Sequence, residues 1–151
     1  MCRFALMLGL LWLTAAGLPA TEVKIIKVLP HYLDAEGRSS LSPSLFERDA
    51  YQAYLRKNRA KRSALRFDVQ WKAPGAEARH LKLRLEVLGT VTHREAPLVV
   101  EQPAKRNPGL GRWSSVTLEE EALKRLGEVV AWRVTLWSED RQLAEQRSFL
   151  W

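Results

Sequence analysis

The sequence predicts a mainly β fold: an antiparallel β-sandwich of about seven strands, with an amphipathic helix inserted after the first strand. Apolar and polar residues alternate along 65–71, 81–87 and 130–137 of the 151-residue chain. Alternation with a period of two is typical of a strand that buries one face. Residues 42–58 instead have apolar residues at helical spacing. The length and the absence of repeats favour one domain over residues 21–151.

The first half of this domain is predicted to hold one strand and the helix. Residues 22–29 are rich in β-branched and apolar side chains and predict the first strand. Ser42 offers an N-cap, and Pro43 suits the first helical position, where no N–H is needed. The apolar stripe expected to pack on the sandwich is Phe46, Ala50, Ala53 and Tyr54, with Leu45 and Leu55 flanking it.

Two strands with clear alternation follow the helix. The connection between 65–71 and 81–87 is short and contains a turn at 73–76, so we expect an antiparallel hairpin. Residues 97–102 predict a shorter strand, and the prolines at its two ends suit the edge of a sheet. The segment 103–111, rich in proline and glycine, predicts a loop.

The last third of the chain is predicted to contain a strand, a short helix and a hairpin. The strand is 113–118. Thr117 and Glu120 have the spacing of a capping box, and Gly127 is placed to end the helix. In the final hairpin, 130–151, alternation directs Val130 inward and Ala131 outward.

Seven short strands separated by turns resemble an immunoglobulin-like or fibronectin type III-like β-sandwich. The strands 65–71 and 81–87 and the hairpin 130–151 carry the resemblance, and Trp71 stands where such folds often place a core tryptophan. The chain also looks like small exported bacterial proteins that combine a signal, one sandwich domain and no assigned activity. The resemblance implies a fold and no particular function.

The resemblance covers residues 22–30 and 64–151. The chain departs from the antibody pattern because Cys2 is its single cysteine, so the cysteine pair of antibody domains is missing. The helix at 42–58 is a further departure.

The first twenty residues have the layout of a secretory signal peptide. A short basic start, Met1 to Arg3, precedes the apolar run 4–13 and a small-residue segment, 14–20. We expect cleavage after Gly17 or Ala20 and a periplasmic or secreted location; the alternative is an uncleaved N-terminal anchor. Cys2 would leave with the signal, so we expect a processed chain without a disulfide.

Basic residues are unevenly distributed in a chain with a formal net charge of +7. A basic cluster lies within 56–62 and consists of Arg56, Lys57, Arg59, Lys61 and Arg62. Such a cluster is typical of a polyanion-binding surface, or else of a solvated helix end where cations are favoured. Nucleic acid is the less favoured polyanion, because we expect the protein to be exported.

Tryptophans supply a second candidate surface. Alternation directs Trp71 and Trp132 into the core and Trp137 outward, while Trp113 adjoins the loop 103–111. Exposed tryptophans near arginines, here Arg112 and Arg133, are typical of a binding surface. The alternative is that Trp113 and Trp137 cover the inserted helix.

No motif predicts catalysis or a cofactor. The histidines His31, His80 and His93 lack metal-ligand spacing, and the sequence contains no GxSxG, P-loop or GxGxxG motif. We therefore expect a non-catalytic exported domain that binds a protein or a cell-envelope component, with no cofactor and no metal. The alternatives are a polyanion-binding protein that uses the basic cluster, and an enzyme of unrecognised type.

Overall fold

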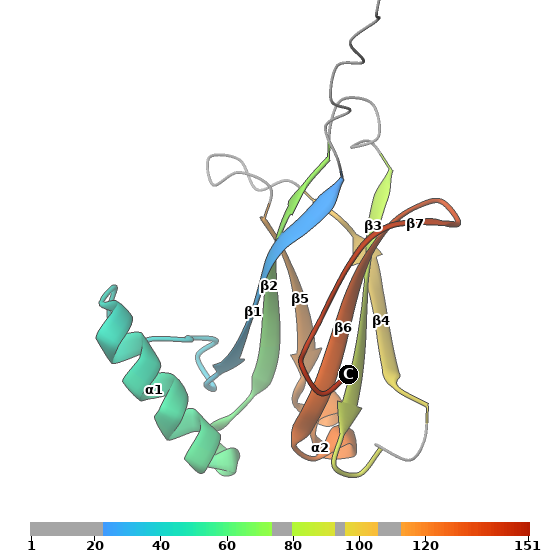
Figure 1. Ribbon diagram of the computed structural model, residues 1–151. Helices are drawn as coiled ribbons and strands as arrows, with labels where there is room; N and C mark the ends of the chain where they lie inside the picture. Colours follow the sequence, from blue (N-terminus) through green and yellow to red (C-terminus); the bar gives the residue numbers. More distant parts are fainter. Residues whose placement is uncertain (1–22, 74–79, 93–95, 106–112) are drawn as a thin grey trace, which may run out of the picture.

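The computed structural model describes residues 23–73, 80–92, 96–105 and 113–151 (Figure 1). Within these ranges the fold is mainly β, as predicted: seven strands form two antiparallel sheets, an arrangement compatible with a β-sandwich. The strands are β1 (Lys24–Leu33), β2 (Ala64–Lys72), β3 (Leu81–Gly89), β4 (Leu98–Pro103), β5 (Trp113–Glu119), β6 (Val129–Ser138) and β7 (Arg141–Arg147). The helices are α1 (Leu45–Lys57), the short 3-10 helix η1 (Arg59–Lys61) and α2 (Glu120–Leu126).

The two sheets contain three and four strands. Their orders are β1-β2-β5 and β4-β3-β6-β7, so β4 lies at an edge as its prolines predicted. The predicted hairpin between 65–71 and 81–87 is wrong, because β2 pairs with β1 and β5 whereas β3 pairs with β4 and β6. Alternation shows which residues share a face, but a short connection fits both a hairpin and a change of sheet.

One core joins the inner faces of both sheets. Phe67 and Val69 of β2 and Leu83 and Leu85 of β3 are completely buried in the same cluster. Trp71 is 1% exposed, as its core assignment predicted, and its indole N–H donates to the buried Ser114 hydroxyl at 3.0 Å. Burial of the indole is thus matched by a partner for its single donor.

The helix starts differ from the prediction. Ser44, rather than Ser42, is the N-cap of α1, and the helix begins at Leu45. Thr117 remains in β5, paired with Arg66, so it caps nothing; the N-cap of α2 is Glu119, whose side chain makes no capping bond. Gly127 ends α2 with a φ of 74°, as predicted.

The final hairpin ends before the predicted position 151. β7 ends at Arg147, and Phe149 is fully exposed. The inward and outward assignments at the start of β6 are reversed, because Val130 is 39% exposed and Ala131 is 1% exposed. The pairing of β3 with β6 shifts register between Leu88 and Gly89, and this irregularity is one that alternation does not reveal.

The helices lie at different places on the sheets. α2 contributes the buried Leu126 to the end of the core. α1 stands beside the sheets, next to β1, with most of its surface away from the core (Figure 1). The helix therefore rests on a sheet edge rather than on an apolar sheet face.

Gly89 provides a test of this packing. A Cβ at position 89 would lie 2.1 Å from the backbone oxygen of Leu126, so Gly89→Ala must displace α2. We expect a loss of about 2–3 kcal/mol in the free energy of unfolding, measured by urea denaturation. Gly37 is the control: its φ is +73° but nothing lies within 4 Å, so Gly37→Ala should cost about 1 kcal/mol. Equal losses at the two positions would contradict the tight contact.

Candidate functional site

Gln52 attaches α1 to the free edge of β1. Its amide oxygen accepts a hydrogen bond from the Tyr32 N–H at 2.8 Å, and its amide nitrogen donates to the Tyr32 carbonyl at 2.9 Å. The same nitrogen donates to the Ser39 carbonyl at 2.8 Å. The buried amide of Gln52 therefore occupies the place that the backbone of a further strand would take.

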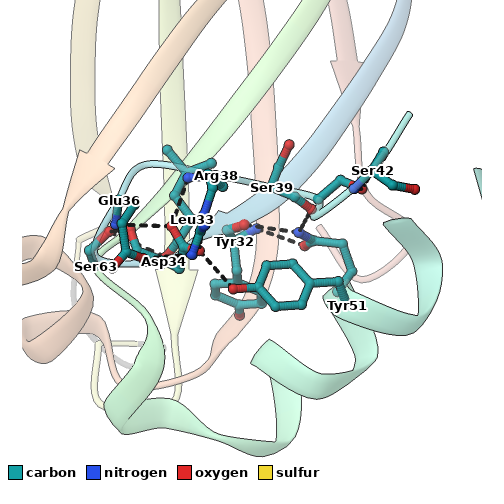
Figure 2. A network of polar contacts seen from close by, with 11 residues as sticks. Tyr32, Leu33, Asp34, Glu36, Arg38, Ser39, Ser42, Tyr51 and Ser63 are labelled. Carbon is teal, nitrogen blue, oxygen red and sulfur yellow. Dashed lines mark hydrogen bonds and ion pairs between the residues drawn. The ribbon is translucent and has the colours of Figure 1, made fainter. Parts of the chain in front are cut away.

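Asp34 organises the segment between β1 and α1. Its carboxylate accepts bonds from the Tyr51 hydroxyl at 2.7 Å and the Arg38 Nε at 2.9 Å, and from the backbone N–H groups of Glu36 and Arg38 (Figure 2). Burial alone would raise the pKa of this carboxyl, but the bonds from Tyr51 and Arg38 outweigh burial and lower its pKa to about 2. Asp34 therefore has a structural role as a charged hub.

Arg62 is not part of a free basic surface. Its side chain is 7% exposed, and its guanidinium donates to the carbonyls of Leu55 and Arg56 and to Glu128. The guanidinium also lies over the Tyr32 ring, 4.2 Å from the centroid. Arg62 therefore ties the end of α1 to β1 and to the residue before β6.

The rest of the basic cluster is exposed. Arg59 is 72% exposed and pairs with Glu128 at 2.5 Å. Arg56, Lys57 and Lys61 lie on the surface around the C-terminal end of α1. The structure thus divides the five predicted cations into one buried clamp, one ion-paired residue and three exposed residues.

Three of the four residues of the apolar stripe of α1 are exposed and Ala53 is half-buried, which contradicts the expectation that the stripe packs on the sandwich. The inward residues are Gln52 and Leu55, with half-buried Tyr51 beside them. Phe46 is 83% exposed and Tyr54 is 45% exposed. We name the stripe the α1 face; it consists of Phe46, Ala50, Ala53 and Tyr54.

Polar surface borders the α1 face. An open groove of about 690 Å³ is lined by Tyr54 and the exposed Leu41 together with charged residues that include Glu36, Arg38 and Lys61. Asp34 also lines this groove, but its carboxylate oxygens are already bonded. The groove joins apolar and charged surface.

The two predicted surface tryptophans lie on different sheets. Trp113 pairs with Gln70 on the outer face of the three-stranded sheet. Trp137 is on the outer face of the four-stranded sheet, where its indole N–H donates to the Thr135 hydroxyl at 2.7 Å. They therefore do not form one surface. α1 is attached to β1 at Tyr32, and Trp113 lies near the other end of that sheet.

One set of side chains has the composition, but not the order, of a catalytic triad. Asp68 accepts a bond from the Ser115 hydroxyl at 2.6 Å, and its other oxygen lies 3.3 Å from His31 Nδ1. In a serine hydrolase the imidazole bridges the serine and the carboxylate. Here the carboxylate is the bridge, so the imidazole has no serine proton to accept. Burial opposes ionisation of Asp68, but bonds from His31 and Ser115 and the charge of Arg66 lower its pKa overall.

Several predicted features fall outside the described residues. They are the signal peptide 1–20, the turn residues 74–76, most of the loop 103–111, His93 and Arg112. Among the residues that are described, no three His, Cys, Asp or Glu side chains converge as a metal site requires. None of the helices seen there is long and apolar enough to cross a membrane.

No protein-family model, curated protein or solved structure matches the chain. Function is therefore inferred from the chain's own residues. Sequence reasoning missed the roles of Gln52 and Asp34. A buried glutamine on a helix with an apolar stripe has no distinctive pattern, and an aspartate three residues before Gly37 has the composition of an ordinary turn.

Replacing Asp34 tests the polar hub. Because folding lowers the pKa of Asp34 from 3.8 to about 2, the charged carboxylate stabilises the fold above pH 4, and this contribution is lost as the pH falls toward 2. We expect Asp34→Asn to lower the free energy of unfolding by about 2 kcal/mol at pH 7, and the difference from wild type to shrink between pH 4 and pH 2.

Glu36→Gln is the matched control for this prediction. Glu36 pairs with the same Arg38, but its side chain is 63% exposed, so its removal should change stability by less than about 0.5 kcal/mol. Urea denaturation at a series of pH values measures both variants. A difference for Asp34→Asn that stays constant down to pH 2 would contradict the assigned role.

Proposed function

We propose that this protein is an exported, non-catalytic binding domain that contacts a protein partner through the α1 face. One observation carries the proposal: Phe46 is 83% exposed, because the side of α1 that is buried holds Gln52 and Leu55 and not the stripe that contains Phe46. An exposed aromatic side chain is stabilised when a partner removes it from water, at roughly 25 cal/mol per Å².

The spacing of the α1 face supports this mode of binding. Phe46, Ala50, Ala53 and Tyr54 follow the i, i+4, i+7, i+8 pattern with which an amphipathic helix enters an apolar groove on its partner. Phe46 and Tyr54 would be the large anchors, and aromatic anchors dominate the energetics of many interfaces. The sheet edge behind α1 holds the helix in a fixed orientation, which reduces the entropy lost on binding.

The proposed fold class is an immunoglobulin-like or fibronectin type III-like sandwich. In support, β1, β2 and β5 lie together and β3, β6 and β7 lie together, as the corresponding strands of immunoglobulin-like domains do. β4 differs from the antibody constant type because it pairs with β3 in the second sheet. Domains of this architecture often serve as recognition modules, although fold alone assigns no ligand.

Export is proposed from the first twenty residues. The basic start, the apolar run 4–13 and the small residues before position 20 support a cleaved signal. The partner would then be a periplasmic, extracellular or envelope protein.

A second candidate function is polyanion binding by the basic cluster without Arg62. Arg56, Lys57 and Lys61 are exposed near the end of α1, and Arg59 adds a further exposed cation. Binding of this kind weakens steeply with salt because counterions are released. Salt therefore separates the two candidates.

The testing experiment isolates partners of the tagged protein from its own envelope fraction at low and high salt. We expect a partner that is retained at high salt and is lost with Phe46→Asp, with affinity reduced at least about thirtyfold. The matched control is Phe149→Asp, because Phe149 is fully exposed and lies outside the α1 face.

Two other results would decide against the α1 face. Retention of the same partner by Phe46→Asp would reject it as the contact surface. Capture that disappears at high salt, and also with Arg56→Glu combined with Lys57→Glu, would favour the polyanion candidate instead.

A further inference from the structure

We infer that the α1 face binds a second copy of this chain, with the two α1 helices antiparallel across a two-fold axis. This inference rests on the proposed function, since it names the partner of the same surface. It is carried by the distribution of charge at the two ends of the apolar stripe.

The exposed charges of α1 are separated by sign, while the half-buried Arg48 lies between the acids and pairs with Asp49 at 3.7 Å. Glu47 and Asp49 lie near the N-terminal end, and the Asp49 side chain is 76% exposed. Arg56 and Lys57 form the last turn and are also exposed. An antiparallel pair of identical helices places the acidic end of each beside the basic end of the other, whereas a parallel pair would oppose like charges.

The small residues allow this pairing to be close. A two-fold axis midway between Ala50 and Ala53 places Ala50 level with Ala53 of the second copy, and the acidic turn 47–49 level with the last turn, 56–57, of the second copy. The alanines let the helix backbones approach each other. Phe46 and Tyr54 then cover the contact at its two ends.

The charges on α1 also argue against a different occupant. A helix that lies on an anionic membrane carries Lys and Arg along its polar face. Here Glu47 and Asp49 flank Phe46, so acids would accompany the main apolar anchor into the headgroups. The helix dipole explains acids at the start and cations at the end, but not an exposed apolar stripe between them.

The size of the contact sets its expected strength. A helix of 13 residues is about 20 Å long, so an isologous pair buries on the order of 1,000 Å². This area is at the low end of specific interfaces and predicts a dimer with a dissociation constant in roughly the micromolar range.

Sedimentation velocity of the purified, processed chain over roughly two decades of concentration around that range tests the inference. We expect a concentration-dependent dimer that Phe46→Asp reduces to monomer. Two charge variants give a sharper test. Glu47→Lys with Asp49→Lys makes both ends of α1 basic, and Arg56→Glu with Lys57→Glu makes both ends acidic. Each variant alone should be monomeric, and an equimolar mixture should dimerise again.

The control reverses two charges elsewhere. Lys24→Glu with Lys27→Glu changes exposed residues of β1 outside the α1 face and should leave the dimer unaffected. Circular dichroism establishes that each variant is folded. Phe46→Asp keeps the test decisive if a charge variant loses its helix, because Phe46 has few contacts to lose.

Three outcomes would overturn the inference: a wild-type chain that is monomeric throughout, a dimer unaffected by Phe46→Asp, or folded charge variants that remain monomeric when mixed. A monomeric wild type that still captures a different partner through Phe46 would overturn the dimer alone. If Phe46→Asp changed neither the sedimentation of the chain nor the capture of a partner, the proposed function would be rejected as well.

Discussion

The orientation of α1 depends on two hydrogen bonds between the Gln52 amide and the backbone of Tyr32. A strand at the edge of a sheet presents N–H and C=O groups that need partners, and Gln52 satisfies both groups of one residue at once. Once Gln52 faces β1, Leu55 follows it inward, and Phe46 is left on the opposite side of the helix. The candidate site is therefore a consequence of how a sheet edge is satisfied.

Two charged residues reinforce the attachment of α1 to the sheet. Asp34 bonds to Tyr51 in the middle of α1, while Arg62 bonds to the carbonyls at the end of the helix and to Glu128. Buried charges are costly unless each is paired, and both are paired here. Because Leu55 is the single apolar residue of α1 that is fully buried, polar contacts rather than apolar area position the helix. Such contacts depend on direction, so they specify one orientation of α1 more strictly than an apolar face would.

The sequence predicted burial correctly where a periodic pattern is compatible with a single arrangement. The inner faces of β2 and β3 could be predicted because a strand half-buried in a sandwich has to alternate. Strand pairing could not, because alternation does not identify the neighbouring strand. In α1 the sequence showed that Phe46 and Tyr54 share a face, but it did not show that this face is exposed. Periodicity identifies residues on one face, whereas burial of that face also depends on which hydrogen bonds the sheet edge needs. Arg62 was misassigned for a related reason, since a buried clamp within a basic run looks like its solvated neighbours.

Assigning Arg62 to the fold changes the relation between the two candidate functions. The exposed cations that remain belong to the end of α1 and the turn after it, next to the apolar stripe. Arg56 and Lys57 are thus on the same helix as the apolar stripe, with acids at the other end of that helix. A polyanion would contact the basic end alone and leave Phe46 in water. A partner helix with cations beside the acids of α1 and acids beside its cations would contact both ends and the apolar stripe together. Since the α1 helix of a second copy, reversed in direction, has that polarity, the charge pattern and the apolar face find a common explanation in self-association.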